Sequence, residues 1–292
     1  MWKKSKSRRI FEVFNVLFMF FMMFIMLYPL IFVLNASFSD SNALIRNGGA
    51  PLWLPLEPTA NAYVMTFKNP LIVSGYLNTI FIVIAGTLVS VIMSAMCAYP
   101  LSKRGLMLNG IITKLIMFTM MFGGGLIPFY LLVKNLGLTD NLWGLIIPTA
   151  ISTYNMIVLR TGFAAVPESL SESALIDGAG HMTILFKIMI PLAKASFAVI
   201  ALYYGVAYWN SWFHASIFLQ RDSKQWPLQL VLRQILIMND VQTGETAIDQ
   251  QQNIAESIKY AVIVVATVPI LCVYPFIQKY FTKGVMVGAV KG

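Results

Sequence analysis

The chain has 292 residues, of which 58% are hydrophobic and 11% are charged, and its formal net charge is +9. Its mean hydropathy of +0.73 excludes a soluble globular protein with an ordinary charged surface and indicates a polytopic membrane protein. The basic excess raises the possibility of nucleic-acid binding, but these residues stand mostly at the ends of apolar runs, where they orient membrane helices. We therefore expect no nucleic acid among the partners.

Two cysteines and two histidines are the candidates for a disulfide or a metal site. Cys97 and Cys272 lie within apolar runs, where cysteine behaves as a small buried hydrophobe. His181 and His214 fall in segments that we predict on opposite sides of the membrane, which does not support a shared metal ion. We expect no metal site, no cofactor and no catalytic residue in this chain.

Apolar runs predict an all-α fold with six transmembrane helices and both termini in the cytoplasm. The basic stretch 1–12 forms the cytoplasmic N-terminus, because the apolar run after it is too long for a signal peptide and lacks a cleavage site. Residues 13–292 are expected to form one six-helix domain. The predicted spans cover residues 13–34, 76–101, 110–133, 142–159, 197–219 and 260–277.

The distribution of basic residues supports this topology. With both termini inside, 13 of the 21 lysines and arginines fall on the cytoplasmic side and seven on the outer side. The remaining one, Lys114, lies within a span. A charge inside the membrane is either functional or, as here close to the inner helix end, belongs to a lysine side chain that extends to the membrane interface. Segment 166–196 is then cytoplasmic, and segment 220–257 lies outside.

Segment 166–196 is polar and carries the signals of two short helices. Pro167 suits the first turn of a helix, and Gly178 can adopt the left-handed conformation that ends one. A second helix is predicted over residues 183–189, ended by Pro191, which cannot continue the hydrogen-bond ladder. Two short helices joined by a turn would form a docking element for another protein.

This segment resembles the EAA loop of the permeases of binding-protein-dependent ABC importers. The matching residues are Glu172, Ser173, Ala174, Asp177, Gly178, Ile188 and Pro191. The family pattern has alanine where this chain has Ser173, a small change in volume. The likeness extends from PTANAY before the second span to QKYFTKGVMVGAVKG at the end. These stretches resemble the carbohydrate permease branch that is related to the inner subunit of the maltose importer. This branch includes the polysaccharide and oligosaccharide permeases of Gram-positive bacteria.

The resemblance implies a type I ABC importer permease in the plasma membrane. In that family two permeases form a heterodimer over two ATPase subunits, and an extracytoplasmic sugar-binding lipoprotein delivers the carbohydrate. This chain has no GxxxxGK[ST] phosphate loop, so ATP and Mg²⁺ are expected on the ATPases, and the chain itself is no enzyme. The alternative, a secondary transporter or channel working alone, would need no docking loop and would more often carry ionisable residues at mid-membrane.

Aromatic and amide side chains in the fourth and fifth spans are candidates for the sugar pathway, because pyranose rings need stacking faces and hydrogen-bonding edges. The other interpretation of the aromatic residues is a belt at the outer membrane interface. Asn210 favours the pathway, since an amide within a span seeks a partner helix or a wet cavity. The candidates are Tyr154, Asn155, Tyr204, Tyr208, Trp209, Asn210 and Trp212.

The outer segment 220–257 contains a predicted amphipathic helix, residues 228–238, that would rest on the membrane surface or on the sister subunit. In the maltose importer branch the loop at this position enters the sugar cleft of the binding protein. The resemblance therefore implies binding-protein contacts at Gln242, Thr243, Gly244, Gln250, Gln251 and Gln252. It also implies that the tail 284–292 reaches the ATPases. A solvated loop and a disordered tail are the alternatives.

Overall fold

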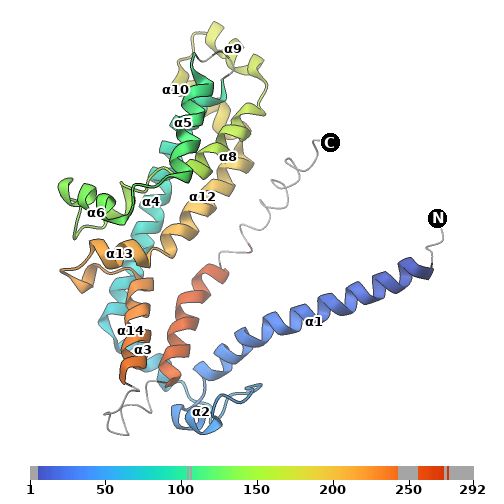
Figure 1. Ribbon diagram of the computed structural model, residues 1–292, viewed down its shortest axis with the longest axis vertical. Coiled ribbons are helices and arrows are strands. Elements are labelled where there is room, and N and C mark those ends of the chain that lie inside the picture. The colour runs from blue at the N-terminus through green and yellow to red at the C-terminus, as the bar shows by residue number, and fades with distance from the viewer. Residues whose placement is uncertain (1–5, 104, 106, 243–255, 273–274, 276–292) are drawn as a thin grey trace. The chain divides into compact units, whose positions relative to one another are not determined.

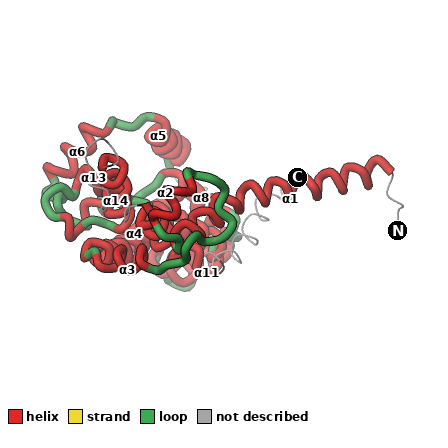
Figure 2. Tube along the Cα trace, turned by 90° about the horizontal axis from the view of Figure 1, so that it is seen from below, coloured by secondary structure: helices red, strands yellow, loops and turns green. Residues whose placement is uncertain are grey.

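The computed structural model describes residues 6–103, 105, 107–242, 256–272 and 275. Over these residues all regular structure is helical, and Figure 2 shows helices joined by loops without a strand. The all-α prediction is confirmed. The chain divides into two compact units, one made of Met1–Asn69 and Gln234–Pro269, the other of Pro70–Arg233 and Ile270–Gly292.

The first unit contains one long helix and several shorter elements (Figure 1). They are α1 (Lys6–Ser37), α2 (Ser41–Asn47), α3 (Asn61–Lys68) and part of a helix described over residues 256–272, of which 256–269 belong to this unit. Asp40 begins α2 by accepting hydrogen bonds from two backbone N–H groups of its first turn, and Gly48 ends it in the left-handed conformation. The prolines between residues 51 and 70 keep this region to short helices, as the sequence predicts.

Helix α1 is long and apolar enough to cross a membrane, and none of the side chains in its most apolar stretch is buried within the chain. A surface of this kind needs lipid or a partner helix to cover it. The helix described from residue 256 packs within the same unit, where Ser257 Oγ lies 2.6 Å from Ser41 Oγ. The Tyr260 ring also makes an edge contact with Phe32.

The second unit is a helical bundle around α4 (Pro70–Ser102), which lies against α8 (Thr153–Ala164) and α12 (Lys194–Trp209) (Figure 1). Its interior is filled by fully buried aliphatic side chains such as Ile82 and Ile200. Burial of this apolar surface against neighbouring helices gives the bundle close packing of the kind found in protein interiors.

Two hydroxyl pairs cross the contact between α4 and α12. Ser94 Oγ lies 2.7 Å from the Tyr204 hydroxyl, and Ser90 Oγ lies 2.8 Å from the Tyr208 hydroxyl. Gly86 lies one turn before Ser90 on α4 and leaves room for the Tyr208 ring. A Cβ at position 86 would lie 2.8 Å from this ring. Small residues on α4 therefore allow the tyrosines of α12 to pack closely.

Three predicted spans are broken in the structure. The third is divided into α5 (Asn109–Met121) and α6 (Leu126–Asn135), bent by 109° at a run of three glycines. The fourth is divided into α7 (Trp143–Ile146) and α8 by a loop that contains Pro148, which cannot donate to a helical ladder. The fifth ends at Trp209 and is followed by α13 (Trp212–Phe218).

By length and composition, two helices among the described residues are able to cross a membrane, α1 and α4. Two bent pairs raise this number to four if each pair is one span: α5 with α6, and the helices over His181–Leu192 with α12. The predicted number of six spans and the position of the termini stay predictions.

The predicted amphipathic helix in segment 220–257 exists as α14 (Leu228–Gln242), and this chain itself covers its first turns, which the prediction gave to lipid or a sister subunit. Leu228, Leu230 and Val231 are almost fully buried within the chain. The backbone N–H of Leu228 donates to Thr79 Oγ1 of α4 over 2.8 Å. The first turns of this helix therefore pack on α4 of the same chain and do not need lipid or a sister subunit to cover their apolar face.

Candidate functional site

Segment 166–196 begins with α9 (Glu168–Ile176), and Pro167, which was predicted in the first turn, lies just before the helix as its N-cap residue. The helix ends in a Schellman turn: the N–H of Gly178 donates to Leu175 O over 3.0 Å, and the N–H of Ala179 donates to Ala174 O over 2.9 Å. Gly178 has a φ of +81°, the left-handed conformation that side chains with a Cβ rarely adopt. The turn fixes the direction in which the chain leaves α9.

The second helical element differs from its prediction at both ends. It begins as α10 (His181–Ile184), continues as a π-helical stretch (Leu185–Met189) and ends as α11 (Ile190–Leu192). Pro191 therefore lies inside the element and does not end it. In the π-helical stretch the N–H of Ile190 donates to Leu185 O, five residues earlier, and this wider turn accommodates a residue without an N–H. The axis then bends by 90° into α12.

The predicted motif residues divide into two sets by exposure. Glu172, Ser173, Asp177, Gly178 and Pro191 are exposed, whereas Ala174 and Ile188 are half-buried and pack against the hydrophobic core of the second unit. The alanine is small enough to let α9 lie close to that core. The polar members of the motif are left on the surface, where another protein can reach them.

Ile176 was not among the predicted site residues. It ends α9, and 87% of its surface is exposed, next to Leu175 at 44%. An exposed large apolar pair in a segment predicted to face the cytoplasm is typical of a surface that another protein covers. The sequence signal was available: two branched apolar residues stand directly before the turn at Asp177 and Gly178.

Two polar contacts lie within segment 166–196 and next to it. The Ser171 hydroxyl, almost fully buried, lies 3.7 Å from the Met189 sulfur and joins α9 to the π-helical stretch. At the end of α4, the Leu101 carbonyl accepts a hydrogen bond from Arg160 Nε of α8 over 2.8 Å. The first contact holds the two helical elements of the segment together, and the second joins α8 to α4.

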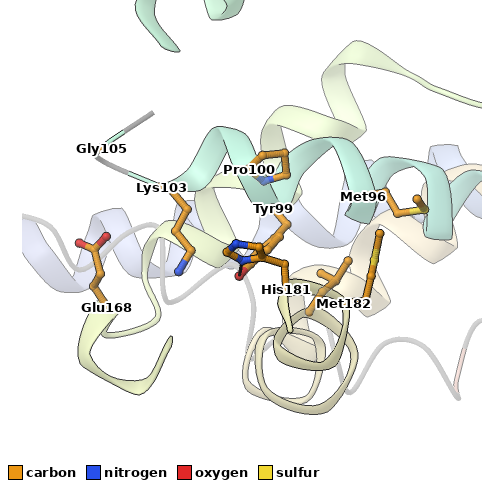
Figure 3. A pocket seen from close by; sticks show the side chains of 9 residues that line it. Met96, Tyr99, Pro100, Lys103, Gly105, Glu168, His181 and Met182 are labelled. Atoms are coloured by element: carbon orange, nitrogen blue, oxygen red, sulfur yellow. Dashed lines mark hydrogen bonds between the residues drawn. The ribbon is translucent and has the colours of Figure 1, made fainter. Parts of the chain in front are cut away.

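A cavity of about 550 Å³ lies where the end of α4 meets α9 and α10. Figure 3 shows Tyr99, Lys103 and His181 gathered at its wall, with Glu168 opposite. The Lys103 ammonium lies 5.3 Å from the centre of the Tyr99 ring, and the Tyr99 hydroxyl lies 3.5 Å from His181 Nδ1. His181, at the N-terminal end of the second helical element, thus contacts α4, and the cavity lies beside this contact.

Two of the predicted pathway residues serve another purpose. Tyr204 and Tyr208 are almost fully buried, and their hydroxyls bond the serines of α4. The Tyr204 hydroxyl also accepts the N–H of Ser152, which caps α8. Both tyrosines hold helices together and do not line an open pathway in this conformation, and their role in the sugar pathway stays a prediction.

The other pathway candidates differ in how far their side chains are exposed. Tyr154 is half-exposed and its ring contacts Tyr203, whereas Asn155 is buried. Asn210 is exposed, and its side-chain amide donates to the Val206 carbonyl of its own helix over 2.8 Å. The Asn210 amide therefore needs no partner helix and no cavity, contrary to the expectation, because the Val206 carbonyl at the end of α12 accepts its hydrogen bond. A role in the pathway stays a prediction for these residues.

The break between α12 and α13 has polar atoms without partners. Trp209 Nε1 and Ser211 Oγ are buried and have no hydrogen-bond partner among the described residues. Next to them, Trp212 is half-buried, and the Arg233 guanidinium lies over its ring, 3.9 Å from the centre. Of the predicted tryptophans, Trp212 thus contacts a cation, Arg233, that was not among the predicted site residues.

The proposed contacts with a binding protein fall at the edge of the described residues or outside them. Gln242 is the last residue of α14. Thr243, Gly244, Gln250, Gln251, Gln252 and the tail 284–292 lie outside the described residues. Over the part of the chain that is described, no group of three or more histidine, cysteine, aspartate or glutamate side chains is arranged to hold a metal ion.

Comparison with known proteins gives matches over nearly the full chain. The protein LplC of Bacillus subtilis is 40% identical over 99% of this chain and 97% of its own length. The polygalacturonan/rhamnogalacturonan transport system permease protein YtcP of Bacillus subtilis is 42% identical over 90% of this chain and 92% of its own length.

A solved structure agrees with these matches. A chain of a bacterial ABC transporter involved in the import of the acidic polysaccharide alginate superposes with a TM-score of 0.85 and 32% identity, covering 96% of this chain and 100% of that one. No family model matches the sequence.

Proposed function

The chain belongs to the permease family of carbohydrate ABC importers, and we propose that it moves an oligosaccharide or a polysaccharide fragment into the cell as one membrane subunit of such an importer. Two relatives carry the cargo class in their names: YtcP is a polygalacturonan/rhamnogalacturonan permease, and the solved transporter imports alginate. The chain would reside in the plasma membrane with six spans and both termini inside.

The observation that carries the proposal is the exposed Schellman turn between α9 and α10. It presents Glu172, Asp177 and Gly178 together with the apolar Ile176. An ATPase that buried Ile176 would gain roughly 1.5–3 kcal/mol from that side chain alone. Because the same segment continues through a 90° bend into α12, a movement of the ATPases would be transmitted directly to a membrane helix.

The energy would come from two ATPase subunits that bind ATP and Mg²⁺, since this chain has no phosphate loop. A sister permease would complete the translocation pathway, and it would cover part of the exposed apolar surface of α1 and α4. An extracytoplasmic sugar-binding lipoprotein would deliver the cargo to the outer segment, with residues 242–252 as the contact and the tail 284–292 at the ATPases. These partners are what the family relationship supports.

Co-purification tests this function. The chain, tagged and expressed in its own cells, is extracted in mild detergent, and the proteins that remain bound are identified by mass spectrometry. We expect an ATPase and a second permease in comparable amounts. The preparation, placed in liposomes with ATP inside and the binding protein outside, should accumulate labelled oligosaccharide. A chain that purifies alone and transports sugar without ATP would contradict the proposal.

A further inference from the structure

The break between α12 and α13 combines features that the fold does not use. Trp209 Nε1 and Ser211 Oγ are buried there without a hydrogen-bond partner among the described residues. Buried polar atoms are rarely left in this state, because each one loses its bonds to water without compensation. Such atoms at a helix break near the predicted outer side are expected to meet a partner in another step of the working cycle.

Arg233 stands over this break from α14. Its guanidinium carbon lies 3.9 Å from the centre of the Trp212 ring, while the side chain is otherwise exposed. Stacking on an indole fixes the plane of a guanidinium and leaves its N–H donors directed outward in that plane. Two parallel N–H groups held in this way match the two oxygens of a carboxylate.

The carboxylates near this break are already engaged. Asp140 accepts hydrogen bonds from the backbone N–H groups of Gln220 and Arg221 and pairs with the Arg221 guanidinium at 3.5 Å. Asp222 accepts the backbone N–H of Lys224 over 2.9 Å. No carboxylate among the described residues forms an ion pair with Arg233. Its guanidinium is therefore available to an anion from outside the chain.

We propose that Arg233, stacked on Trp212, binds the carboxylate of a uronate residue in the transported sugar chain, and that this subunit thereby selects acidic over neutral oligosaccharides. Trp209 Nε1 and Ser211 Oγ, buried at the same helix break, would supply a donor and a hydroxyl to sugar hydroxyl groups once the break opens in another step of the cycle. The inference rests on the proposed function and narrows its cargo: a neutral sugar offers nothing to the fork of the guanidinium, whereas a uronate forms two charge-assisted hydrogen bonds with it.

The test uses the assembled transporter in liposomes, with ATP inside and binding protein saturated with sugar, so that the step within the permease limits import. Two labelled probes differ only in charge: trigalacturonate and its fully methyl-esterified, neutral form. For the R233Q variant we expect import of trigalacturonate to fall about tenfold, the loss of one charged hydrogen-bonding partner. Import of the ester should change less than twofold.

R233K is the matched variant, because it keeps the charge and loses the planar fork. It should restore less than half of the trigalacturonate rate if the carboxylate is bound by two parallel N–H groups. Equal losses for the acid and the ester would show that Arg233 only packs on Trp212, and this result would overturn the inference. A wild-type transporter that imports the ester but not the acid would overturn it too, with the proposed function intact. Import of no carbohydrate at all would contradict the proposed function itself.

Discussion

Replacing Gly178 with valine is expected to remove most ATP-driven uptake while the chain stays folded in the membrane. Gly178 has a φ of +81° at the turn that ends α9. A residue with a Cβ pays about 1–2 kcal/mol for this conformation, and a β-branched one more. No atom lies within 4 Å of a Cβ built there, so the effect arises from the backbone: the turn opens, and α10 is directed away from its position on α4.

The matched control is Gly180→Val, two residues further on. Gly180 has φ −70° and ψ 157°, which valine adopts readily, and the space around its Cβ is also open. Uptake, ATP hydrolysis and the amount of bound ATPase are measured for both variants. We expect Gly178→Val to lose uptake and bound ATPase and Gly180→Val to keep both. Equal activity of the two variants would show that the turn does not position the coupling segment.

A Gly86→Ala substitution is expected to lower the stability of the bundle by about 1–3 kcal/mol, the usual cost of overpacking a core. The added Cβ would lie 2.8 Å from the Tyr208 ring. That ring cannot move freely, because its hydroxyl is bonded to Ser90 of the same helix as Gly86. The thermal unfolding of the purified protein in detergent measures the effect.

Gly205→Ala, on the facing helix, serves as its control. The nearest atom to a Cβ there is Thr87 Oγ1 at 3.6 Å, an ordinary contact. Alanine also favours a helix over glycine by about 1 kcal/mol, so this variant should unfold at the wild-type temperature or above it. If both variants unfold alike, the α4–α12 contact is looser than the structure indicates.

The elements that local chemistry determines were predictable from the sequence. The order of Pro167, a polar helix, Asp177 and Gly178 contains its own start and stop signals, and the structure has α9 and its turn where these signals place them. The break in the third span was visible as three successive glycines, although hydropathy alone predicted one helix. Composition reports that a segment is apolar and says nothing about where it bends.

What the sequence did not determine depends on contacts between distant residues. The sequence around Tyr204 and Tyr208 favours sugar stacking, because nothing in it shows that their hydroxyls form hydrogen bonds with Ser94 and Ser90 of α4. The apolar face of α14 was assigned to lipid or to a partner, although α4 of the same chain covers its first turns. Pro191 stays inside a helical element because a π-helical stretch precedes it, a local geometry that has no sequence signal of its own.

The central claim is that the turn after α9 contacts an ATPase, and a site-specific cross-link tests it most directly. Cys97 and Cys272 are replaced by alanine, and a single cysteine is placed at Ile176, which is 87% exposed. A second single-cysteine chain carries it at Ile45, which is 49% exposed on the predicted outer side. The thiol is coupled to a short reagent that cross-links any neighbouring residue on illumination, and on the assembled transporter we predict a product with the ATPase from position 176 and none from position 45. An intact complex that gives no ATPase product from position 176, or gives one from position 45, would contradict the account.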